Sequence, residues 1–313
     1  MKGNLKERKG ITLIALVVTI IILLILAGVT IYFAVNSGLI EKTQEAKNKS
    51  EQATQNELNT LNEIYGELNR YLPNEETVEN ISKTESYVGY YADINADGTV
   101  DGIIYADLAK GNTGDGQWYD SDGNYTIPVA EGVKDYYISK TNYEGSFGTK
   151  DVLSPTGTGK DRFYIMALTD IDGKRNGTLY DWYNAAYGNM SDYATATSGD
   201  FGTGKANTNA MIAKWDAKAY GEQDQSTNNK DMWGQIKSQV ANGWFVPSRA
   251  EWSAFAEELG ITKENYANKG LSDDYWSSAQ YDTFRAFNAR FGRGYMDFGG
   301  VYNGGYVRLS ATF

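Results

Sequence analysis

The chain contains no cysteine and no histidine. Their absence excludes thiolate nucleophiles, disulfides, imidazole bases, zinc sites built from these residues and covalent haem attachment. Proline is also scarce, with 4 residues against 34 glycines, 24 tyrosines and 11 phenylalanines. This balance favours many short strands and tight turns that carry aromatic side chains. Any catalysis would have to rely on carboxylates, hydroxyls, lysine or tyrosine, and the composition is more typical of a binding surface.

Basic side chains are fewer than acidic ones. The 313 residues include 29 basic and 40 acidic side chains, which gives a net charge of -11 and a pI near 4.7. Such a chain is repelled by phosphate backbones, so we predict no nucleic-acid partner. With 41% hydrophobic residues the chain is long enough to form about two globular domains.

Residues 11–35 carry no charged side chain. As a helix that rises about 1.5 Å per residue, this segment exceeds the roughly 30 Å of a bilayer core. The sequence therefore predicts a transmembrane helix over 11–40, by which the chain would contact the membrane. The preceding residues 1–10 are mainly basic, which places the N-terminus in the cytoplasm and the rest outside. We expect a single-pass protein of the cell membrane with an extracellular C-terminus.

The segment Lys9-Gly10-Ile11 ends a short basic leader directly before the apolar run. It resembles the prepilin peptidase site of type IV pilins and pseudopilins. The resemblance implies cleavage between Gly10 and Ile11, with prepilin peptidase as a partner. The fifth residue of the implied mature chain is Ala15, where pilins usually have Glu. A membrane-tethered or tip-located subunit is therefore as consistent with the sequence as self-assembly into a pilus.

Residues 41–73 contain a second helical pattern, with apolar side chains at Leu58, Leu61, Ile64 and Leu68 before Pro73 stops it. We predict a long helical stalk that continues from the first helix. Two roles remain open for it, a solvated spacer or a helix that packs on neighbouring copies.

Residues 74–160 alternate short aromatic and β-branched runs with Gly, Asn and Asp, and predict the β-rich first part of an ectodomain. One turn in this part spaces oxygen-bearing side chains as a calcium loop does, with Gly98 at its sixth position. Its candidate ligands are Asp93, Asn95, Asp97 and Asp101. The twelfth position is Ile104 and not Glu, so an Asx-rich turn explains the same residues. Calcium is the one candidate cofactor, and no cofactor is certain.

Later in the chain, helical patterns mix with strands, and Ser248 and Glu251 form a capping box ahead of a helix that should bury Trp252. Three segments carry a resemblance: GWFVPSRAEW at 243–252, YWSS at 275–278 and YVRLSATF at 306–313. Together they resemble the variable proteins of diversity-generating retroelements. The resemblance covers 161–313 and implies a C-type-lectin-like domain related to the formylglycine-generating enzyme fold. The expected class is thus α+β, a transmembrane, pilin-like long helix followed by a C-type-lectin-like ectodomain.

Residues 279–305 have neither a strand nor a helix period. In the resembling family a reverse transcriptase mutates template adenines, so the exchanged residues are those reachable from Asn codons. The family frame would comprise Ala279, Gln280, Tyr281, Thr283, Ala286, Asn288, Ala289, Phe291, Gly294, Tyr295, Met296 and Val301, while Phe287 and Gly305 stay unassigned. Thirteen changeable, ligand-binding residues then remain, all within that reachable set. They are Asp282, Phe284, Arg285, Arg290, Gly292, Arg293, Asp297, Phe298, Gly299, Gly300, Tyr302, Asn303 and Gly304. The three arginines among them would form a local positive spot that steers acidic partners.

The sequence thus predicts a surface-displayed, non-enzymatic protein that binds a surface protein or other macromolecule through a face diversified by a retroelement. The alternative is a pilus or pseudopilus subunit with a fixed structural or adhesive head. An enzyme of the formylglycine-generating type is disfavoured, because that chemistry depends on active-site cysteines.

Overall fold

A computed structural model describes residues 13–36, 39–71, 79–114, 123–183, 197–217 and 230–313. The chain divides into two compact units, Met1–Thr77 and Val78–Phe313. The predicted processing site at Gly10 and Ile11 lies outside the described residues.

The described residues of the first unit form two helices, α1 (Leu13–Asn36) and α2 (Leu39–Tyr71). On α2, exposed pairs such as Glu45–Lys49 at 2.8 Å lie one turn apart and add modest support to the helix. No helix within the described ranges combines the length and the apolar character needed to cross a bilayer. The prediction of a transmembrane helix over 11–40 is corrected by this finding. The expected fold class, which included that helix, is wrong in this respect.

The second unit is α+β and contains a six-stranded sheet with the order β11-β7-β2-β1-β6-β5. The strands are β1 (Tyr91–Ala92), β2 (Gly102–Asp107), β5 (Asp135–Gly145), β6 (Gly148–Thr156), β7 (Phe163–Ala167) and β11 (Ser310–Thr312). All neighbours in it pair antiparallel except β1 and β6. Strands from both sides of the predicted boundary at residue 160 share this sheet, so 79–160 and 161–313 form one structural unit.

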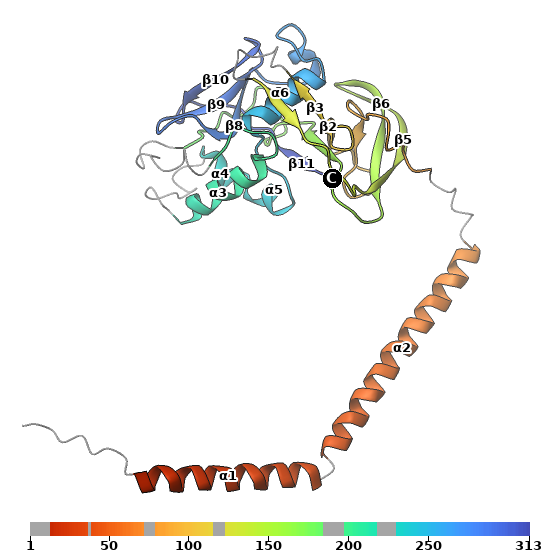
Figure 1. Ribbon diagram of the computed structural model, residues 1–313. Coiled ribbons are helices and arrows are strands. Elements are labelled where there is room, and N and C mark those ends of the chain that lie inside the picture. Colours follow the sequence, from red (N-terminus) through yellow and green to blue (C-terminus); the bar gives the residue numbers. More distant parts are fainter. Residues whose placement is uncertain (1–12, 37–38, 72–78, 115–122, 184–196, 218–229) are drawn as a thin grey trace, which may run out of the picture. The chain divides into compact units, whose positions relative to one another are not determined.

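A second, three-stranded antiparallel sheet has the order β10-β9-β8. It consists of β8 (Asp274–Gln280), β9 (Arg285–Arg290) and β10 (Tyr295–Gly300). A short hairpin pairs β3 (Asn112–Gly114) with β4 (Tyr125–Ile127). In Figure 1, β8–β10 and the β5–β6 pair lie on opposite sides of the second unit.

Helix α6 (Arg249–Glu258) packs against strands of all three sheets: β2, β4, β8 and β9. Its predicted capping box is confirmed, since the Ser248 hydroxyl accepts a bond from the Glu251 N–H while the Glu251 carboxylate accepts one from the Ser248 N–H. Trp252 is fully buried, as predicted, and its ring stacks on Tyr275 of β8 with centroids 5.0 Å apart. The remaining helices are α3 (Gly204–Asp216), α4 (Met232–Gln235), α5 (Lys237–Ala241) and the 3-10 helix η3 (Tyr266–Lys269).

A buried ion pair connects the C-terminal segment to β8. Arg308 Nε donates to Asp170 Oδ1 at 2.8 Å, and both side chains are almost completely buried. Asp170 also accepts bonds from the Tyr275 and Ser272 hydroxyls, at 2.7 and 2.9 Å. A buried carboxylate with this many donors is satisfied, which holds β8 in a fixed position relative to the last strand.

Candidate functional site

The predicted changeable positions differ from their frame in exposure. Of the thirteen, all except Gly299 are exposed or partly exposed. Most of the frame is buried, namely Ala279, Gln280, Ala286, Asn288, Ala289, Phe291, Met296 and Val301. In the register of β9 with β10, Phe298 lies opposite Phe287 and Asp297 lies opposite Asn288, so changeable positions occur on both faces of these strands. Alternation of side chains therefore does not by itself produce the division. The structure brings the thirteen positions onto one sheet and its turns.

A cluster of four side chains, which we call the aromatic cluster, forms the centre of this surface: Tyr281, Arg285, Phe287 and Phe298. The rings of Tyr281 and Phe298 stack with centroids 4.1 Å apart and an interplanar angle of 16°. The Arg285 guanidinium lies over both rings, at 4.7 and 4.4 Å from their centroids. Phe287 contacts Tyr281 edge to face at 5.2 Å. Stacked rings and a guanidinium supply a large contact area at low conformational cost.

Asp282 orients the arginine of the aromatic cluster. Its Oδ2 accepts a bond from Arg285 Nε at 2.7 Å and a second from Nη2. These bonds lower the pKa of the Asp282 carboxyl, so the pair stays ionised at neutral pH. Asp282 and Arg285, both predicted to be changeable, are therefore coupled, and replacement of one removes a hydrogen-bond partner of the other.

Arg290 lies between two carboxylates, Asp274 at 3.6 Å and Asp297 at 3.3 Å. Burial raises the pKa of Asp274 to about 6, although the Arg290 charge opposes the shift. Arg293 donates to the Tyr295 hydroxyl at 3.2 Å. Because Arg285 and Arg290 are each matched by carboxylates, the expected positive spot is largely neutralised, and charge steering is not the property that this surface offers.

The outer part of the surface is apolar and aromatic. Phe284 is 52% exposed and Tyr302 is 60% exposed. Substitution is restricted at all four predicted glycines. A Cβ would overlap Asp273 Oδ1 at Gly292 and would lie 2.7 Å from Leu179 Cβ at Gly304. It would lie 3.2 Å from the Trp276 ring at Gly299 and 3.2 Å from the Tyr302 ring at Gly300. Side chains at these positions would require neighbouring groups to move.

Arg249 belongs to this site and was not predicted from the sequence, where it reads as the first residue of a capped helix. Its guanidinium carbon lies 5.1 Å from the centroid of the Phe287 ring. Phe287, which the sequence left unassigned to frame or contact surface, joins the aromatic cluster. Only the folded chain brings the start of α6 next to β9, so no local sequence signal would have identified the contact.

The predicted calcium loop is closed by its own carboxylates. Asp93 accepts bonds from the Asp97 and Gly98 N–H groups, at 3.1 and 2.9 Å. Asp101 accepts one from Ile94 N at 2.8 Å, and Asn95 donates to Asp97 at 3.1 Å. Among the residues that the structure describes, no group of three or more acidic side chains is placed to hold a metal ion. This bonding pattern favours the Asx-rich turn.

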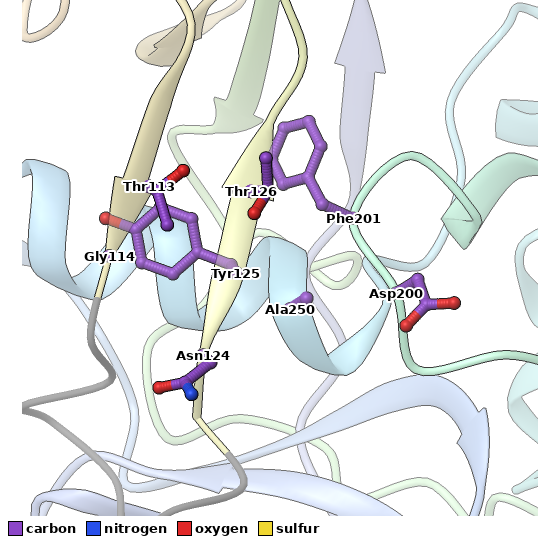
Figure 2. Close-up of a pocket in the computed structure, with 8 residues that line it drawn as sticks. All are labelled: Thr113, Gly114, Asn124, Tyr125, Thr126, Asp200, Phe201 and Ala250. Atoms are coloured by element: carbon purple, nitrogen blue, oxygen red, sulfur yellow. The ribbon is translucent and has the colours of Figure 1, made fainter.

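A pocket of about 710 Å³ opens beside the N-terminal end of α6. Figure 2 shows the strands of the β3–β4 hairpin on one side and the segment with Asp200 and Phe201 on the other, with Ala250 of α6 between them. The hairpin contributes Thr113, Gly114, Asn124, Tyr125 and Thr126. The sequence did not predict this pocket, because its walls come from three distant segments.

Comparison with known proteins returned no match to any protein-family model and no curated protein of significant similarity. The function therefore has to be argued from the geometry of these sites.

Proposed function

We propose that this protein binds a macromolecular ligand through the surface of β8–β10 and that a retroelement exchanges the exposed residues of that surface. The observation that carries the proposal is a difference in exposure: the changeable positions other than Gly299 are exposed or partly exposed, while most of the frame is buried. A protein whose contact residues are frequently replaced needs this arrangement. Substitutions in a core lower the free energy of unfolding by several kcal/mol, whereas surface substitutions usually change it by no more than about 0.5 kcal/mol.

The chemistry of the surface fits recognition of another protein. Aromatic residues and Arg are enriched in protein interfaces, and Tyr and Arg are common among the residues that contribute most to binding. Here exposed Phe284 directly precedes β9 and exposed Tyr302 follows β10, and a bond from Val301 N to Phe284 O at 2.9 Å joins these two segments. In this proposal the surface has no catalytic role and needs no cofactor.

The resemblance of 161–313 to retroelement variable proteins supports the same proposal, since the changeable positions were assigned from the family frame and independently of exposure. Sequencing the 3′ end of the gene across a clonal population and its relatives tests it. We expect substitutions concentrated at Phe284, Arg293, Tyr302 and the other exposed positions, each traceable to a template adenine.

The matched control is the buried frame in the same reads, for example Ala286, Asn288 and Met296. An invariant segment 279–305, or substitutions spread equally over frame and exposed positions, would contradict the proposal. A fixed sequence would leave the aromatic cluster as a constant surface and favour the alternative of a fixed structural or adhesive head.

A further inference from the structure

The pocket beside α6 presents neutral polar groups on one wall. Thr113 of β3 pairs with Thr126 of β4 across the hairpin, so both side chains lie on the same face. Asn124 lies two residues before Thr126, and all three side chains are exposed. Two hydroxyls and one amide offer donors and acceptors without charge.

The opposite wall provides the Phe201 ring and the Asp200 carboxylate, whose Oδ2 accepts a bond from the Ser198 hydroxyl at 2.9 Å. The Phe201 ring is half-buried and packs on Tyr164 with centroids 4.8 Å apart. The Asp200 carbonyl accepts bonds from the Thr203 and Ser248 hydroxyls, at 2.7 and 2.8 Å. The Gly202 N–H donates to buried Glu251 at 3.0 Å. These bonds preform the wall before any ligand arrives, which lowers the entropic cost of binding.

Charge restricts the class of ligand. No lysine or arginine lies among the described residues that line the pocket, while Asp200 does. Glu258 lies close by, where it accepts a bond from the Tyr125 hydroxyl at 3.0 Å. Phosphates and carboxylates would be repelled by these groups. A purely apolar ligand would leave the threonine and asparagine groups without partners, which costs free energy.

We propose that the pocket bounded by Thr113, Thr126 and Phe201 binds a neutral saccharide. A sugar has an apolar face of C–H groups that packs on an aromatic ring, and hydroxyls that donate to a carboxylate and exchange bonds with threonine and asparagine side chains. The volume of about 710 Å³ lies within the range of small-molecule sites, roughly 300 to 1,000 Å³. This site is separate from the aromatic cluster and does not depend on the function proposed for it.

Saturation-transfer NMR on the full-length protein tests the proposal. The probes are glucose, galactose, mannose, N-acetylglucosamine, N-acetylgalactosamine and their common disaccharides at millimolar concentration. We expect at least one saccharide to bind, and Phe201→Ala to raise its Kd by about tenfold or more. Because Phe201 packs on Tyr164, thermal melting must show that this variant folds.

Asn124→Ala is the second variant, since the Asn124 side chain is exposed and its loss leaves the core intact. We expect a severalfold weaker Kd for it, with unchanged melting. Tyr302→Ala, an exposed aromatic change outside the pocket, is the matched control and should leave saccharide binding unaltered. Absence of binding by every saccharide, or binding that survives both pocket variants, would overturn the proposal.

Discussion

The guanidinium of Arg249, at the start of α6, lies over the ring of Phe287 in the middle of β9, with 5.1 Å between the Arg Cζ and the ring centroid. This contact joins the helix that supports the core to the sheet that carries the exposed positions. A Cβ added to Gly199 would lie 3.2 Å from Arg249 Nε, so the arginine is also confined from its other side. The aromatic cluster is therefore held in place by a residue outside the changeable segment.

Arg249→Ala should lower the free energy of unfolding by about 0.5 to 1 kcal/mol, the usual value of a partly exposed cation–π contact. Arg293→Ala is the matched control, because Arg293 is exposed and its contact is with the Tyr295 hydroxyl. We expect that control to stay within about 0.5 kcal/mol of the wild type. Urea denaturation measures both, and equal effects of the two changes would show that the Arg249 contact does not stabilise the fold.

Trp276→Ala and Tyr302→Ala should differ sharply, although both remove an aromatic side chain from the same region. Trp276 is buried and its Nε1 donates to Tyr180 O at 2.7 Å. Its loss should cost about 3 to 5 kcal/mol. Tyr302 is 60% exposed, and its loss should cost less than about 0.5 kcal/mol. Chemical denaturation monitors both variants, and a large loss for Tyr302→Ala would show that this position belongs to the frame.

Arg308→Met should destabilise the protein by about 3 to 5 kcal/mol, because it leaves the Asp170 carboxylate buried without its cation. Lys237→Met is the control, since Lys237 pairs with Asp216 at an exposed position and such pairs contribute about 0 to 1 kcal/mol. Thermal and urea unfolding give the two values. Comparable losses in both variants would mean that burial does not set the strength of the Arg308–Asp170 pair.

Asp231 predicts a pH dependence of stability. Burial raises the pKa of this carboxyl to about 7, well above its unfolded value of 3.8. Between these values the folded state holds the proton that the unfolded state has lost, so the free energy of unfolding falls as pH rises from about 4 to 7. The slope from one such group is at most about 1.4 kcal/mol per pH unit.

Asp231→Asn removes this titration and retains the Oδ1 that accepts a bond from Trp233 N at 3.1 Å. The variant should show a shallower decline in urea midpoints over the same pH range. A residual decline is expected, because burial also raises the pKa of Glu251 to about 7 and that of Asp274 to about 6. An unchanged slope in Asp231→Asn would contradict the assignment.

Local sequence patterns determined several features of the protein. The capping box at Ser248 and Glu251, the burial of Trp252 and the mixture of strands with short helices follow from spacings of a few residues, and the structure confirms them. The transmembrane helix over 11–40 was also inferred from local composition, and the described helices do not support it.

Only the tertiary structure decided which distant segments meet. Strand β11, at the C-terminal end, pairs with β7 nearly 150 residues earlier, as in the register of Ser310 with Met166. The contact of Arg249 with Phe287, the carboxylate partners of Arg290 and the walls of the pocket depend on such long-range packing. The spacing of apolar residues along the chain indicates the periodicity of a single helix or strand. The long-range contacts depend instead on the free energy of packing the whole second unit.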